Sequence, residues 1–260
     1  MILNTGQRTD IPAYYSEWFY NRIKEGYVLA RNPFNPVLVS RYELTPELIE
    51  LLCFCTKNPA PMLPRIHELD AYRQFWYVTI TPYDKDIEPY VPDKSAVIDA
   101  FKELSEYLGL KNIGWRYDPV LITEKYDLKF HMRKYEKMCE ALEGYTDNCV
   151  ISFIDLYEKT VRNFGGVRRV TDAKQDILAE SFAKSANAHG ITIRGCCEKR
   201  SLARFGWDMS GCTTKAVIER AVGESLDIPA TPKTAAAERL FQAILGGKSD
   251  DAAAATRDAM

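Results

Sequence analysis

The sequence has almost no net charge, no long apolar run and no recognisable leader. Its 34 Lys and Arg residues nearly balance its 36 Asp and Glu residues, which leaves a formal charge of -2. We therefore expect no general attraction to nucleic acid or to an anionic membrane. No apolar segment approaches the roughly 18 residues that cross a bilayer. The N-terminus, MILNTGQRTD, has no basic segment followed by an apolar core, so we expect a cytoplasmic protein without a signal peptide.

Several familiar catalytic motifs are also missing. No glycine-rich phosphate loop follows the first apolar segment, and there is no nucleophile elbow and no helix with paired histidine ligands. The three histidines, His67, His131 and His189, are isolated in the sequence, and we assign none of them to catalysis. The seven Cys residues include an adjacent pair but lack the spacing of a secreted disulfide framework. We expect a reducing compartment, with the thiols free or bound to metal.

What the sequence does contain is a repeated pattern of an apolar strand followed by polar residues and then proline. In segment 112–123, NIGWRYDPVLIT, apolar residues lead into Arg116, Tyr117 and Asp118 before Pro119. The charged side chains need water or a ligand, because an unpaired buried charge costs several kcal/mol. Pro119 disfavours helical backbone at the residue before it, so we expect the strand to end there. The same pattern with proline occurs in 51–59 and 74–84, and apolar residues followed by polar ones, without proline, occur in 149–157 and 191–198.

Helical segments separate these predicted strands. The sequence favours helices over 12–25, capped by Asp10, and over 95–109, 125–142 and 172–189. Segment 27–44 contains two Asn-Pro steps and predicts a hairpin or a stiff excursion, and a short helix is expected from Thr45. Strands alternating with helices favour a parallel sheet with helical crossovers. We predict an α/β fold, a whole or partial (β/α) barrel of the TIM type, over 1–229, followed by a poorly packed Ala-rich tail, 230–260.

In barrels of this kind the functional site lies at the carboxyl ends of the strands. Each polar residue that follows a strand is, taken alone, typical of a cap, a turn or a surface ion pair. Their shared position is what makes the set a candidate site. The predicted site consists of Arg8, Asp10, Lys57, Asn58, Thr81, Tyr83, Arg116, Asp118, Asp155 and Glu198.

Long motifs in the chain resemble a known family. The segments QRTDIPAYYSEWFYNRIKEGYVLARNPFNP, CTKNPAPML, WRYDPVL and SFIDLY, and the CCE motif with a later Cys212, resemble the bacterial family of domain of unknown function 1848. The resemblance covers residues 1–228. That family looks related to radical SAM enzymes, and its members usually close with a three-cysteine cluster at the C-terminus. Its substrate is not established.

The resemblance implies a radical SAM-type barrel with a [4Fe–4S] cluster, S-adenosylmethionine and a reductant protein as partner. The implied substrate is a small molecule. In such a site Arg116 and Lys57 would hold anionic groups of the ligand. Asp118, Asp155 and Glu198 would be the catalytic carboxylates, binding hydroxyl or amine groups or carrying protons.

The chain departs from the family pattern after Cys212, because no further cysteine follows. From residue 230 the sequence reads TPKTAAAERLFQAILGGKSDDAAAATRDAM, and our hypothesis is a truncated or frame-shifted end. We therefore expect this chain to bind no cluster. Cys196, Cys197 and Cys212 are the only cysteines near the predicted mouth of the barrel, but their spacing matches no usual zinc or iron–sulfur pattern. We assign no metal ligand.

Three functions follow from this reading. The first is a radical SAM-type enzyme family, represented here by a chain that lacks its cluster ligands. The second is a cofactor-free barrel that binds a small anionic metabolite at the same mouth. The third is a nucleic-acid repair lyase, which rests on analogy of fold alone; the near-neutral charge speaks against it.

Overall fold

A six-stranded parallel sheet forms the centre of the molecule in a computed structural model that describes residues 1–227 except 7–8, 33, 36, 165–166 and 199. The strands follow one another across the sheet in chain order. They are β1 (Ile2–Asn4), β4 (Leu51–Thr56), β5 (Gln74–Thr79), β6 (Ile113–Val120), β7 (Asn148–Phe153) and β8 (Thr192–Gly195). The predicted α/β architecture with a parallel sheet is confirmed. Closure into a whole or partial barrel stays a prediction.

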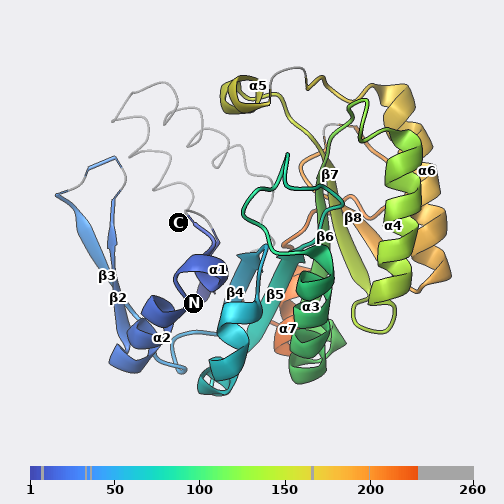
Figure 1. Cartoon of the computed structure of the whole chain (residues 1–260). Coiled ribbons are helices and arrows are strands. Elements are labelled where there is room, and N and C mark those ends of the chain that lie inside the picture. Colours follow the sequence, from blue (N-terminus) through green and yellow to red (C-terminus); the bar gives the residue numbers. More distant parts are fainter. Residues whose placement is uncertain (7–8, 33, 36, 165–166, 199, 228–260) are drawn as a thin grey trace.

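The crossover helices cover one face of this sheet. A right-handed crossover between neighbouring parallel strands returns on the same side each time, and α3 (Lys94–Leu108), α4 (Leu128–Leu142) and α6 (Asp172–Ala188) lie together there (Figure 1). Aromatic rings form the contact. Trp115 of β6 stacks on Tyr135 of α4 with ring centroids 5.0 Å apart, and Tyr135 stacks on Phe182 of α6 at 4.2 Å. All three side chains are fully buried.

Part of the opposite face of the sheet, over β4 and β5, is covered by α7 (Lys215–Val222). Val217 and Ile218 of this helix pack against Leu51 of β4 and Phe75 of β5. Side chains alternate between the two faces of a strand. Arg116 and Asp118 of β6 therefore lie on the face that α7 shares, since Trp115 and Tyr117 belong to the core under the crossover helices. Because of this alternation, Arg116 and Asp118 can contact only side chains on the α7 side of the sheet.

Two expectations about the N-terminal third need correction. The first helix is divided at Tyr15 into α1 (Ile11–Tyr14) and α2 (Ser16–Glu25), and residues 46–48 form a turn where we expected a helix. The Asp10 cap is confirmed, because its carboxylate accepts from the Ala13 N–H at 3.1 Å. The hairpin is also confirmed: β2 (Tyr27–Arg31) and β3 (Val39–Glu43) pair antiparallel and stand apart from the main sheet (Figure 1).

The end of β6 differs from the prediction as well. The strand does not stop before Pro119 but continues to Val120. The ladder to β7 shifts register between Tyr117 and Val120. At such an irregularity the N–H that proline lacks is not needed for pairing, so Asp118 remains part of the strand.

The remaining described elements are short. They are α5 (Glu158–Asn163) and the 3-10 helices η1 (Ala60–Leu69), η2 (Leu110–Asn112) and η3 (Ala203–Phe205). No helix within the described ranges is both long enough and apolar enough to cross a membrane. The predicted boundary at 229 and the tail 230–260 lie outside the described residues.

His131 of α4 lies in the core under the crossover helices. Its Nδ1 lies 2.8 Å from the Tyr117 hydroxyl, and its Nε2 lies 2.8 Å from the Leu121 carbonyl oxygen. The side chain is fully buried, and this burial lowers the pKa of His131 from 6.5 to about 4. The native state therefore holds a neutral imidazole at a pH where the unfolded chain already binds a proton.

We predict that His131 makes the folded state less stable in mild acid. As pH falls from 6.5 towards 4, the unfolded state takes up a proton that the native state does not, so stability falls with pH in this window. Between pH 7 and pH 5 the loss in unfolding free energy attributable to His131 is about 2 kcal/mol. Urea unfolding at the two pH values measures it. The loss should shrink in His131→Gln and persist in His67→Gln, whose side chain is exposed; an equal loss in all three proteins contradicts this.

Candidate functional site

Three polar side chains from two neighbouring strands meet at the carboxyl ends of β6 and β7. Arg116 donates two hydrogen bonds to Asp118 Oδ2, one of them from Nε at 3.2 Å. Ser152 of β7 donates to the other oxygen, Asp118 Oδ1. The Arg116 and Asp118 side chains are 17% and 18% exposed. This pair is therefore largely removed from water, and each charge depends on its partner.

A group of thiols lies beside this network. The Cys196 thiol, directly after β8, donates to the Cys212 sulfur at 3.3 Å and lies 3.8 Å from the sulfur of Cys197. Cys212 precedes α7, and its carbonyl oxygen accepts from the Tyr77 hydroxyl at 2.5 Å. Gly114 makes room for the Tyr77 ring, because a Cβ there would lie 2.5 Å from it. The close packing of β5 and β6 thus helps to fix the position of Cys212.

The hydrogen bond between Cys196 and Cys212 and the charge of Arg116 shift the pKa values of the two thiols. The bond that Cys212 accepts from Cys196, together with the charge of Arg116, lowers the pKa of Cys212 well below that of an ordinary thiol. Donating that bond, and being buried, raises the pKa of Cys196. The Cys212 thiolate is thus favoured over the Cys196 thiolate.

Glu198, in the loop after β8, also lies at the carboxyl ends of the parallel strands. Its Oε1 accepts from the Phe153 N–H, at the end of β7, at 2.7 Å. Burial, with further contributions from the negative charges of Asp155 and Asp118, raises the pKa of Glu198. Asp155 itself is exposed and accepts from the Tyr157 hydroxyl at 3.2 Å. Of the predicted site, the structure thus brings together Arg116, Asp118, Asp155 and Glu198.

The other predicted site residues are engaged elsewhere. Lys57 forms an ion pair with Glu88 at 2.5 Å. Asp10 accepts from the Lys57 N–H at 2.7 Å in addition to capping α1. Asn58 accepts from the Ala60 N–H at 3.2 Å, which is a local turn contact.

Thr81 and Tyr83, after β5, are buried. The Tyr83 hydroxyl donates to the Pro119 carbonyl at 2.7 Å and accepts from the Leu121 N–H at 2.9 Å, so it ties β5 to β6. Arg8 lies outside the described residues.

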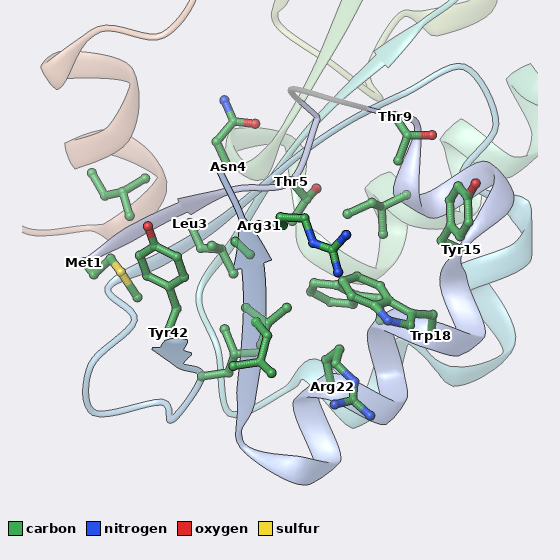
Figure 2. A pocket seen from close by; sticks show the side chains of 17 residues that line it. Met1, Leu3, Asn4, Thr5, Thr9, Tyr15, Trp18, Arg22, Arg31 and Tyr42 are labelled. Atoms are coloured by element: carbon green, nitrogen blue, oxygen red, sulfur yellow. The ribbon is translucent and has the colours of Figure 1, made fainter. Parts of the chain in front are cut away.

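Sequence reasoning missed a cavity of about 630 Å³ on the free side of β1, between that strand, α2 and the β2–β3 hairpin. Its walls are mainly apolar, including Leu3, Phe19 and Val28. Figure 2 shows Trp18 and Arg22 projecting from α2 and Arg31 reaching from β2 towards Trp18. The signal that was available is the aromatic stripe Tyr15–Trp18 of the first helix. Trp18 remains 43% exposed, so part of this aromatic surface lies outside the core.

The thiol group does not fit an iron–sulfur cluster. Cys196 and Cys212 touch through their sulfur atoms, and sulfurs in direct contact leave no space for a cluster between them. Within the part of the chain that the structure describes, no group of three or more His, Cys, Asp or Glu side chains could hold a metal ion. The expectation that this chain binds no cluster stays a prediction.

We predict that Asp118→Asn destabilises the protein by about 3 kcal/mol, because it leaves the poorly solvated Arg116 guanidinium without a counter-charge. Removing both charges in Arg116→Met/Asp118→Asn should recover part of that loss. The control is Glu224→Ala, which breaks the exposed pair with Arg73 and should cost under about 1 kcal/mol. Urea denaturation measures all three. Equal losses for Asp118→Asn and Glu224→Ala contradict the buried pair.

Comparison with models of protein families places the chain in a family. The family model described as "Domain of unknown function (DUF1848)" matches residues 2–241. The match extends beyond residue 228, where we expected the resemblance to end. Neither the curated proteins nor the solved structures contain a match to this chain. The matched range covers nearly the whole chain, and the protein belongs to the family of domain of unknown function 1848.

Proposed function

We propose that the carboxyl ends of β6, β7 and β8 form the active site of an enzyme acting on a small polar molecule, within a partial (β/α) barrel. The observation that carries the proposal is the meeting of Arg116, Asp118 and Ser152 with Glu198 from the following loop. Carboxyl groups with a shifted pKa beside a specific charged partner are typical of functional sites. Proteins with parallel sheets usually bind their ligands at the carboxyl ends of the strands.

Glu198 is the proton donor in this proposal. A raised pKa keeps its carboxyl protonated to higher pH than an ordinary glutamate, which suits a general acid. The Phe153 N–H holds Oε1 in place and so orients the group. Asp118 positions Arg116 through two hydrogen bonds, and the guanidinium then presents its other N–H groups in a fixed direction.

The charges at this edge favour a ligand that carries hydroxyl or amine groups. Asp118 balances the charge of Arg116, so Asp155 and Glu198 leave carboxyl groups in excess among the converging residues. Lys57, which we expected to attract an anion, is held by Glu88. A small anionic metabolite therefore suits this edge less well than a polyol or an amine.

The iron–sulfur and S-adenosylmethionine chemistry implied by the family resemblance is not part of this proposal. The cysteines of this edge contact one another directly, and the proposed acid–base roles require neither the cluster nor a reductant protein. Nucleic-acid repair rests on analogy of fold alone, and no observation favours it.

We predict that ligands of this edge depend on Glu198. Saturation-transfer NMR with a panel of small polyols and amines identifies compounds that bind the wild type. Their affinity should fall about tenfold in Glu198→Gln, the equivalent of one hydrogen bond of about 1.4 kcal/mol. Lys57→Met is the matched control, because its charge is already paired, and it should leave affinity unchanged. Compounds that bind Glu198→Gln as tightly as the wild type contradict the proposal.

A second candidate function is binding of an apolar ligand in the cavity beside β1. Its volume of about 630 Å³ lies within the range of about 300–1,000 Å³ typical of ligand sites. The apolar walls suit an acyl or aromatic body, and Arg22, whose guanidinium is paired with Glu25 at 3.2 Å, also lines the cavity. This version of a cofactor-free binding protein uses a different place from the predicted mouth of the barrel.

Tryptophan fluorescence tests this second candidate. Trp18 lines the cavity, whereas Trp76, Trp115 and Trp207 are buried, so a ligand in the cavity should change the emission of Trp18 alone. We predict a blue shift on titration with decanoate that disappears in Trp18→Phe and weakens in Leu29→Glu, which places a charge in the apolar wall. A shift that survives in Trp18→Phe, or no shift in the wild type, contradicts binding there.

A further inference from the structure

Cys196 and Cys212 differ from the other cysteines of the chain in their surroundings. Cys139 and Cys149 are fully buried among apolar side chains, and burial raises the pKa of both thiols. Cys196 and Cys212 instead contact each other through sulfur at 3.3 Å, at the end of the sheet where Arg116 lies. A disulfide bond measures about 2.05 Å, so the two sulfurs need to approach by little more than an ångström to become bonded.

We propose that Cys196 and Cys212 form a redox-active dithiol that undergoes exchange with disulfides of low molecular weight. The Cys212 thiolate attacks one sulfur of the external disulfide, whose S–S bond breaks and releases the first thiolate. The Cys196 thiol then loses its proton to solvent and attacks the Cys212 sulfur, which releases the second thiolate. The cysteine pair loses two electrons, and the external disulfide gains them and leaves as two thiols.

The order of the two cysteines follows from their environment. Cys212 is partly exposed, accepts a hydrogen bond from the Cys196 thiol and lies near the Arg116 guanidinium. Thr213 adds a second donor to its sulfur, Oγ1 at 3.8 Å. A thiolate stabilised in this way is the usual attacking group in thiol exchange. Cys196 is more buried, so it is reached by the partner cysteine more readily than by an external reagent.

The backbone holds the two sulfurs in contact. Cys197 has a φ of +57°, which places it in the left-handed region that non-glycine residues seldom adopt. This turn directs the chain away after Cys196. On the other side, the Tyr77 hydroxyl holds the Cys212 carbonyl at 2.5 Å. Two strands and a strained turn thus fix the pair, which lowers the entropy lost when the bond forms.

This inference goes beyond the proposed function and does not depend on it, because exchange requires neither Glu198 nor a bound polar substrate. Cytoplasmic disulfides are usually transient and are catalytic or redox-sensing. A dithiol at the same edge as the proposed active site would make the activity of that site responsive to the thiol–disulfide balance.

The test uses the full chain and glutathione disulfide as the probe. Reduced protein is mixed with the probe at pH 7, quenched with acid, alkylated and mapped by mass spectrometry. The expected product is a Cys196–Cys212 disulfide without bound glutathione. In Cys196→Ser the reaction should stop at a mixed disulfide between glutathione and Cys212. In Cys212→Ser only Cys196 of the pair is left to react with glutathione disulfide. This reaction should be about tenfold or more slower than that of the wild-type pair, since the favoured thiolate is gone.

Cys197→Ser is the matched control, because it removes the exposed neighbour and should leave both the product and its rate unchanged. The mapping of the wild type stands on its own if a variant fails to fold. The proposal is overturned if glutathione accumulates only on Cys197, if the pair stays reduced while Cys197 reacts, or if Cys212 reacts no faster than the core cysteines. Because the readout is the mapped disulfide, failure here leaves the Glu198-dependent ligand binding untouched, and the reverse also holds.

Discussion

The pairing of Arg116 with Asp118 is the constraint on which the carboxyl edge of the sheet depends. The strand places both side chains on one face, two residues apart, and the surrounding structure leaves each less than one fifth exposed. Neither charge is tolerable there without the other. Within the pair, Asp118 accepts a hydrogen bond from Ser152 and contributes to the raised pKa of Glu198, while the charge of Arg116 helps to lower the pKa of Cys212. The chemistry proposed for this edge is therefore a property of a connected group of side chains and not of any single residue.

Much of the fold could be predicted from local patterns. The apolar segments followed by polar residues predicted β4, β5, β6, β7 and β8 near their observed positions, and helical spacing predicted α3, α4 and α6. These elements are encoded in consecutive residues. The continuation of β6 through Pro119 depends on its pairing with β7, which a local pattern does not contain. The division of the first helix at Tyr15 is not visible in the helical spacing either.

The sequence indicated that candidate site residues follow the strands, but not which of these residues come together. Residues that follow a strand alternate in direction, so a shared place in the pattern does not imply a shared face. The Tyr83 side chain is buried in the core, and Lys57 forms an ion pair with Glu88, which lies 31 residues further along the chain. Cys196 and Cys212 are 16 residues apart, and only the fold brings their sulfurs into contact. The cavity beside β1 escaped prediction for the same reason, since its walls come from a strand, a helix and a hairpin.

The central claim is that Asp118 and Glu198 belong to one electrostatic unit at the carboxyl edge. Carbon-13 NMR titration of the Glu198 carboxyl tests it most directly, in the wild type and in Asp118→Asn. The account predicts a pKa above the usual value of about 4.3 for glutamate in the wild type, and a lower pKa once the negative charge of Asp118 is removed. A Glu198 pKa at or below the usual value, or one that Asp118→Asn leaves unmoved, would contradict the account.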